Sequence, residues 1–203
     1  MDSSSMIGSY KITGSIYSEK ATHYAKNASF IFDKFLDKYI SKLSVKEVID
    51  IGCGPGQDTD YFNRMHIKAI GVDSCLEMIE IAKKNYPWKF ELFDVISSNY
   101  FKNKKIQNVW LSAVLMHFKR KDLEIFLKDL SSALVKKGIV GIIIPEKMKN
   151  DWRRSGWEKL GAIFNPFSVE EISFFLKKAD LKIDCVHKFK YMKSDWLFII
   201  AKK

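Results

Sequence analysis

The stretch Glu47-Val-Ile-Asp-Ile-Gly-Cys-Gly-Pro-Gly-Gln-Asp-Thr59 decides how this chain folds. Apolar, β-branched residues surround Asp50 and predict a buried strand. Gly52, Gly54 and Gly56 then occupy alternate positions, and a segment with helical spacing follows. Glycine permits backbone conformations that other residues avoid and lets a ligand approach the main chain. The start of a helix adds unpaired N–H groups. The stretch therefore predicts a strand, a tight turn and a helix start that bind an extended, polar molecule of the adenosine type.

The length of 203 residues suits one α/β domain and is short for two. No apolar run approaches the roughly 18–20 residues of a membrane span, and residues 1–5 lack the basic start and apolar core of a signal peptide. The three cysteines, Cys53, Cys75 and Cys185, match no zinc or redox spacing. We therefore expect free thiols in a reducing, cytoplasmic compartment, and no bound metal.

The net charge of +10 comes almost wholly from lysine, since only four of the 34 basic residues are arginine. These lysines are scattered along the chain, which favours solvated helix faces over a nucleic-acid site. Net charge bears on solubility and non-specific binding rather than on a defined site. Nucleic acid stays open as an alternative partner. The chain has no internal repeat or linker, so we expect a single domain over residues 1–203.

Strand-like and helical segments alternate along the chain. The expected strands are Val45–Ile51, Ala69–Asp73, Phe90–Val95, Asn108–Leu115, Ile139–Pro145, Leu181–Lys190 and Trp196–Lys202. The expected helices include Asp58–Met65, Leu76–Asn85, Asp122–Leu134 and a segment from Ser168 to about Ala179, with one or two more between Ile16 and Ile40. This order predicts an α/β fold: a seven-stranded, mostly parallel sheet with helices on both faces and an antiparallel C-terminal hairpin.

Local signals mark some of the helix ends. Ser74 with Glu77, and Ser168 with Glu171, have the spacing of capping boxes. The run Lys136-Lys137-Gly138 is typical of a helix that ends in basic residues followed by a glycine.

The run Asp50-Ile-Gly-Cys-Gly-Pro-Gly56 resembles the first motif of the class I, Rossmann-like S-adenosylmethionine (SAM)-dependent methyltransferases. Leu111-Ser-Ala-Val-Leu-Met-His-Phe118 is similar to the fourth motif of small, free-standing members of the ubiquinone/menaquinone-biosynthesis type, and residues 196–203 are similar to their last strand. The resemblance runs from about Tyr17 to Lys202. It departs at Gln107-Asn108, where many relatives carry an acid that is not catalytic. It implies SAM as the cofactor and methyl transfer as the reaction.

The glycine spacing and its neighbouring acids agree with this cofactor. Gly-x-Gly-x-Gly differs from the Gly-x-Gly-x-x-Gly of dinucleotide sites. A carboxylate at Asp50 would repel a pyrophosphate, whereas SAM carries an ammonium and a sulfonium. Asp73 lies about 20 residues beyond the turn, which suits hydrogen bonds from ribose hydroxyls. The family pattern assigns the next acid, Asp94, to the adenine amino group. The residues expected to bind the cofactor are Asp50, Gly52, Gly54, Gly56, Asp73, Ser74, Asp94, Val95, Ser112 and Tyr24.

Residues 1–40 are expected to form a helical cap over the cofactor. The pair Tyr17…Tyr24 resembles the entry to the glycine motif in small-molecule methyltransferases, where an aromatic ring closes over the methionine end. Tyr24 therefore has two interpretations, a cofactor contact or a core residue.

Methyl transfer from a sulfonium is a direct in-line displacement, so positioning and a general base are the main requirements. His117 follows the fourth strand at the edge where such sheets bind ligands, and we expect it to act as the base; the alternative is a packing histidine. Within residues 147–167, Trp152 and Arg154 could grip an anionic or aromatic acceptor, or the segment could be an ordinary lid.

The sequence thus predicts transfer of a methyl group from SAM to a small-molecule acceptor, with S-adenosylhomocysteine as the other product. An RNA or tRNA methyltransferase and a SAM-binding partner protein without catalysis stay open as alternatives. A nucleotide-dependent oxidoreductase is disfavoured by the glycine spacing and Asp50. We expect a monomer or a homodimer.

Overall fold

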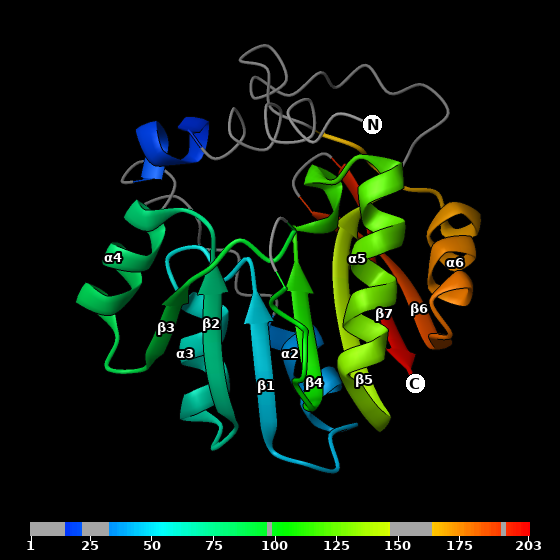
Figure 1. Ribbon diagram of the computed structural model, residues 1–203, viewed down its shortest axis with the longest axis horizontal. Helices are drawn as coiled ribbons and strands as arrows, with labels where there is room; N and C mark the ends of the chain where they lie inside the picture. The colour runs from blue at the N-terminus through cyan, green and yellow to red at the C-terminus, as the bar shows by residue number, and fades with distance from the viewer. Residues whose placement is uncertain (1–14, 22–32, 97–98, 147–163, 192–193) are drawn as a thin grey trace.

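A computed structural model of the chain describes residues 15–21, 33–96, 99–146, 164–191 and 194–203 (Figure 1). Its strands form a seven-stranded sheet in the order β3-β2-β1-β4-β5-β7-β6. The strands are β1 (Glu47–Ile51), β2 (Lys68–Asp73), β3 (Lys89–Leu92), β4 (Ile106–Ser112), β5 (Leu134–Pro145), β6 (Lys182–Tyr191) and β7 (Ser194–Lys202). Strands β1 to β5 are parallel, and β7 is antiparallel to both β5 and β6. The predicted fold class is confirmed.

Helices cover both faces of this sheet (Figure 1). The helices are α2 (Asp33–Ile40), α3 (Gln57–Arg64), α4 (Leu76–Asn85), α5 (Arg120–Ala133) and α6 (Val169–Lys178), with a 3₁₀ turn, η1 (Leu115–His117). A further helix covers residues 15–21. None of the described helices is long and apolar enough to cross a membrane.

The alternation of side chains along β4 divides the core into two layers. Val109 and Leu111 pack in a cluster with residues of α5 and α6, while Trp110 packs on the other face with residues of α2 and α3. Because successive side chains of a strand point to opposite faces, an unbroken apolar strand must be covered twice. Because β1 to β5 run in the same direction, their carboxyl ends lie at one edge of the sheet, and the glycine turn that follows β1 lies at this edge.

Two of the predicted helix signals are wrong and one is confirmed. Helix α5 ends at Ala133 and β5 begins at Leu134, so the run 136–138 lies in a strand, and Lys137 rather than a glycine has the positive φ of 70°. The pairing of β4 with β5 shifts register at this point. Helix α4 starts without the predicted cap from Ser74, because its N-cap is Cys75 and no side chain caps it. The cap of α6 is present, since the Glu171 N–H donates to Ser168 Oγ at 3.1 Å.

Candidate active site

The glycine turn between β1 and α3 holds Gly52, Gly54 and Gly56 at positive φ angles of 71°, 53° and 93°. A Cβ atom at Gly52 would come within 2.2 Å of Val114 Cγ2, and one at Gly56 within 2.8 Å of the Phe90 ring. A Cβ atom at Gly54 would meet no described atom within 4 Å. The first and third glycines therefore permit close packing, and Gly54 leaves the main chain open to a ligand.

Asp73, at the end of β2, ties the glycine turn to the start of α4. Its Oδ2 accepts a hydrogen bond from the Gly54 N–H, and its Oδ1 accepts one from the Cys75 N–H, each at 2.9 Å. Burial raises the pKa of this carboxyl, and the backbone donors oppose that rise. The Oδ1 bond also replaces the predicted capping box, because Cys75 is the N-cap and Ser74 makes no side-chain cap. The Glu77 carboxylate instead accepts from Ser18 Oγ at 2.6 Å.

Asp50 lies beneath the turn with only 2% of its surface exposed. Its carboxylate accepts from Thr59 Oγ1 at 2.6 Å and from the Thr59 backbone N–H. Thr59 belongs to the first turn of α3, whose N-cap, Gly56, supplies no side-chain bond. Asp50 therefore accepts hydrogen bonds from the first turn of α3, where backbone N–H groups lack partners within the helix, and it adds an acidic group to the site.

Asp58 is a second acid at the start of α3, and sequence reasoning did not assign it to the site. Its Oδ2 accepts from Trp110 Nε1 at 2.7 Å, and the carboxylate also accepts from the Ser112 hydroxyl. Burial raises the pKa of Asp58 to about 6, although these two donors lower it. Ser112, predicted to bind the cofactor, thus contacts Asp58 within the protein. No sequence signal pointed to this contact, because an acid in the first turn of a helix is common.

These carboxylates make the turn electronegative. Asp50 has a pKa well above the usual range because it is buried and because Asp58 and Asp73 lie near it. The same charges and burial raise the pKa of the Cys53 thiol, so this cysteine is not a reactive thiolate. A cation bound beside the turn would relieve the repulsion among these acids, whereas an anion would add to it.

The ends of β2 and β3 add an apolar rim to the site. The Phe93 N–H donates to the Asp73 carbonyl at 2.8 Å, which brings the two strand ends together. Leu76 is 49% exposed and Phe93 is 37% exposed. Such side chains can cover the faces of a flat aromatic group. Their sequence signal was an apolar residue just beyond each strand, which is too common to be assigned alone.

Asp94 and Val95 lie beyond β3 rather than inside the predicted strand. Asp94 Oδ1 accepts from the Ile96 N–H at 2.9 Å, which orients the carboxyl at this rim. Val95 is partly buried and packs against the larger core cluster. Ser74 is exposed between β2 and α4. These positions surround the same strand ends as Asp73, and their contact with a cofactor stays a prediction.

His117 lies in η1, beyond the carboxyl end of β4. Its Nε2 is 2.9 Å from the Tyr17 hydroxyl, and the two rings meet edge to face with centroids 5.4 Å apart. Tyr17 belongs to the 15–21 helix, which places this helix at the predicted edge of the sheet. Tyr24, Trp152 and Arg154 lie outside the described residues, as does most of the predicted lid.

The described residues contain no group of three or more histidine, cysteine or acidic side chains placed to hold a metal ion. What the site does contain is an open glycine, an acidic turn, an apolar rim and a histidine beyond the fourth strand.

Several known proteins are similar to this chain in sequence or in fold. Residues 48–138 match a family model described as a methyltransferase domain. The chain is 31% identical over 99 residues to the ubiquinone biosynthesis O-methyltransferase of Pelagibacter ubique, a match that covers 47% of this chain and 40% of that protein. It is 38% identical over 92 residues to protein 235L of Invertebrate iridescent virus 6, which carries a provisional methyltransferase name; this match covers 42% of the chain and 34% of the relative. The chain thus spans less than half the length of either relative.

Solved structures resemble the chain over more of its length. The 1,6-didemethyltoxoflavin-N1-methyltransferase of Burkholderia thailandensis, determined with 1,6-didemethyltoxoflavin and S-adenosylhomocysteine, has a TM-score of 0.77 and covers 96% of this chain and 88% of its own. Its sequence identity is 16%, so the likeness concerns the fold. A SAM-dependent methyltransferase from Methanosarcina mazei has a TM-score of 0.69 at 17% identity and covers 83% and 96% of the two chains.

Proposed function

Because this chain belongs to the class I SAM-dependent methyltransferases, we propose that it transfers a methyl group from SAM to a small-molecule acceptor. The observation that carries the proposal is the acidic glycine turn, in which Asp73 accepts from the Gly54 N–H and Asp50 lies near both Asp58 and Asp73. SAM combines a cationic methionine end with an adenosine end. The turn suits the first of these, and the apolar rim at Leu76 and Phe93 suits the second.

The residues of the site fit this cofactor better than a dinucleotide. Three carboxylates close to the turn would repel a pyrophosphate, and each would have to be neutralised before such a group could bind. Asp73 is held in place by two backbone N–H groups, so its position does not depend on the ligand. Asp94 lies on the next loop of the same rim. The proposed contacts are ribose hydroxyls to Asp73 and the adenine amino group to Asp94.

When bound, SAM supplies an electrophilic methyl group on a sulfonium sulfur. The glycine turn and Asp73 would hold it so that a lone pair of the acceptor could bond to the methyl carbon while the electron pair of the carbon–sulfur bond stayed on sulfur. His117 takes the proton that the acceptor loses, since histidine is a side chain suited to proton transfer near neutral pH. The walls of the site align acceptor and methyl group, which can supply much of the lowering of the barrier.

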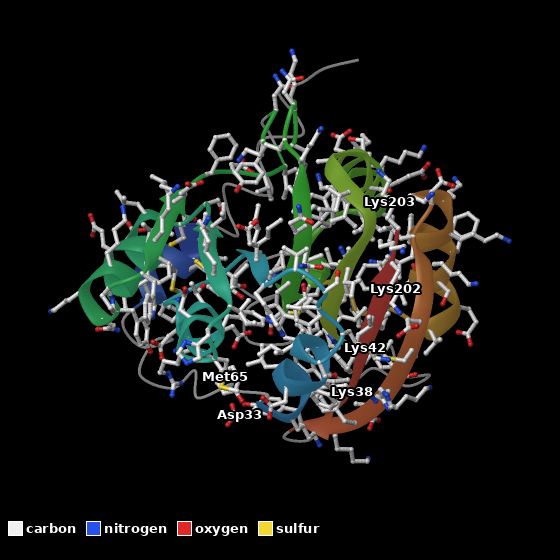
Figure 2. The ribbon with its side chains drawn as sticks, turned by 90° about the horizontal axis from the view of Figure 1, so that it is seen from below. Asp33, Lys38, Lys42, Met65, Lys202 and Lys203 are labelled. Carbon is white, nitrogen blue, oxygen red and sulfur yellow. The ribbon has the colours of Figure 1, made fainter. Side chains whose placement is uncertain are left out.

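A small acceptor is supported by the names of the relatives, and four lysines of the described chain lie away from the site. The Pelagibacter ubique relative is named for ubiquinone biosynthesis and the Burkholderia thailandensis neighbour for a toxoflavin precursor. Figure 2 labels Lys38, Lys42, Lys202 and Lys203 on the side seen from below, away from the strand ends that carry the glycine turn. Lys42 and Lys202 pair there with Asp184 at 3.4 and 2.8 Å. Lys42 and Lys202 are therefore engaged in surface ion pairs rather than in an RNA-binding surface.

Thermal unfolding with added ligands tests the cofactor. SAM and S-adenosylhomocysteine should raise the melting temperature, since a ligand that binds only the native state must stabilise it; NAD should not. Stabilisation by NAD and none by SAM would overturn the proposal. A screen of cell metabolites with methyl-labelled SAM, read by mass spectrometry, then identifies the acceptor. Cofactor binding without turnover on any metabolite would favour a non-catalytic SAM-binding partner, and salt-sensitive binding to RNA would favour an RNA methyltransferase.

A further inference from the structure

The contact between Tyr17 and His117 joins residues that are 100 positions apart in the chain. The Tyr17 hydroxyl faces one particular ring nitrogen, Nε2, at 2.9 Å. A neutral histidine carries its proton on one nitrogen and a lone pair on the other, and a hydrogen bond to either nitrogen selects between the two forms. The contact can therefore decide which nitrogen of His117 is able to accept a proton.

The position of Tyr17 is set by contacts that do not involve His117. Ile16 and Ala21, on the same short helix, are 6% and 3% exposed. Ala21 packs with Cys75 and Met78 at the start of α4. Ser18 Oγ donates to Glu77 Oε2 at 2.6 Å. The helix is thus fixed to α4, and the fold brings the phenol to the histidine.

The position of His117 is set equally firmly from the other side. Its backbone N–H donates to the Val114 carbonyl at 2.9 Å, and the Val114 side chain lies against Gly52 of the glycine turn. Asn165 holds both flanks of the turn: its N–H donates to the Met116 carbonyl at 2.7 Å, and its side-chain amide donates to the Phe118 carbonyl at 2.8 Å. These contacts hold the backbone on both sides of the pair, the 15–21 helix and η1, in place.

We propose that Tyr17 is a positioning residue that holds His117 in the form protonated on Nε2, with its hydroxyl oxygen accepting from that N–H. The inference rests on the proposed role of His117 as a base. Because Nε2 faces Tyr17, a lone pair on that atom would be taken up by the phenol. Only the form with its proton on Nε2 keeps the proton-accepting lone pair on Nδ1. Tyr17 then plays the part that an orienting acceptor plays toward the histidine of a catalytic triad. It acts through His117 and does not itself react.

The test reads the two ring nitrogens directly, in full-length protein labelled with ¹⁵N-histidine. Two-bond ¹H–¹⁵N correlation spectra are recorded about two pH units above the unperturbed histidine pKa of about 6.5, so that the rings are neutral. The signals of His117 are identified by their loss in His117→Gln. Spectra are then compared for wild type, Tyr17→Phe and Tyr61→Phe. Tyr61 is the matched control, since its hydroxyl donates to Asp37 Oδ1 at 2.7 Å on an exposed surface.

Wild type should show His117 protonated on Nε2 with a lone-pair resonance for Nδ1. In Tyr17→Phe the two resonances should move toward each other as the ratio of the two forms falls by about two- to tenfold, the effect of losing one hydrogen bond. Tyr61→Phe should match wild type. A wild-type proton on Nδ1, or a Tyr17→Phe spectrum identical to wild type, would overturn the inference. Ser18→Ala, which keeps the phenol but removes the bond to Glu77, should produce a smaller change in the same direction.

Isothermal titration of SAM into the same samples separates this inference from the proposed function. Wild type and Tyr17→Phe should bind SAM alike. A wild-type protein without affinity for SAM would refute the proposed function, while the nitrogen resonances would still decide whether Tyr17 orients His117.

Discussion

Binding of SAM should depend on pH through Asp58. Its pKa of about 6 results from burial, opposed by hydrogen bonds from Trp110 and Ser112. A bound cation favours the ionised carboxylate, so the ionised form should be the one that binds. About nine tenths of the molecules are then competent at pH 7 and about one tenth at pH 5. The apparent Kd should therefore rise about tenfold between these values, or roughly 1.4 kcal/mol.

The same carboxylate should make the free protein less stable as pH rises. The pKa of Asp58 is raised from 3.8 to about 6 in the folded chain, so between about pH 4 and pH 6 the folded state binds more protons than the unfolded state. The free energy of unfolding must then fall across this window and stay low above it. A difference of about two pKa units corresponds to about 3 kcal/mol, and we expect roughly half of that because Asp58 is only half-buried.

The assay is isothermal titration of SAM between pH 5 and 7.5, in two buffers of different ionisation enthalpy, for wild type and Asp58→Asn. Wild type should release about half a proton on binding near pH 6, where half of the carboxyls are protonated. Asp58→Asn should lose both the proton release and the pH dependence, and should melt at a higher temperature than wild type at pH 7.5. Asp60→Asn is the control on the same helix, where Asp60 pairs with Arg64 at 2.9 Å. An equal Kd at both ends of the range, or an unchanged profile in Asp58→Asn, would refute the reasoning.

Five substitutions test the other assigned roles. Gly54→Val should abolish SAM binding while circular dichroism shows a retained fold, because its side chain enters space that no described atom fills; normal binding would mean that the turn does not contact the cofactor. Asp73→Ala should weaken SAM binding by about 1–3 kcal/mol and also lower the melting temperature, since it removes the acceptor of two backbone bonds; unchanged affinity would contradict the ribose assignment. His117→Ala should keep SAM affinity and lower turnover by about 10²–10⁴, and the reverse pattern in titration and steady-state kinetics would place the histidine in the cofactor pocket. Trp152→Ala and Arg154→Ala should each mainly raise the acceptor's KM, as loss of uniform binding does; a fall in kcat alone would argue against substrate gripping.

The parts of the structure that follow from local pattern were predictable from the sequence. The apolar run of β4 had to be covered on both faces, and Trp110 and Leu111 do lie in different core layers. The three glycines of the turn do take positive φ angles. Such features depend on residues a few positions apart, where period and glycine content act directly.

The partners of the site residues were not predictable, because they come from distant parts of the chain. Asp58 meets Trp110 across 52 positions, and His117 meets Tyr17 across 100. The prediction of a capping box at Ser74 was wrong for the same reason. The Glu77 carboxylate accepts from Ser18, 59 positions away, and the Asp73 carboxylate accepts from the Cys75 N–H. Gly138 was expected to take the left-handed conformation after a helix end, but Lys137 takes it instead. The reason is that β5 begins directly after α5 and its pairing with β4 shifts register there. Contacts of this kind are decided by tertiary packing, which overrides local propensity.

The acidic turn also explains why ligand binding and stability should be linked in this protein. Burial raises the pKa of Asp50, Asp58 and Asp73, and the charges of Asp58 and Asp73 raise the pKa of Asp50 further, so folding brings together charges that repel. A site that violates the usual electrostatic rules is expected where function requires it. A proton or a bound cation weakens the repulsion among these carboxylates, so protons and a cationic ligand compete for the site. At neutral pH the cation should displace the remaining protons, so a cationic ligand should stabilise the fold more than its neutral product S-adenosylhomocysteine, which lacks the sulfonium charge but keeps the ammonium. The difference between the two ligands should shrink as Asp58 becomes protonated below about pH 6.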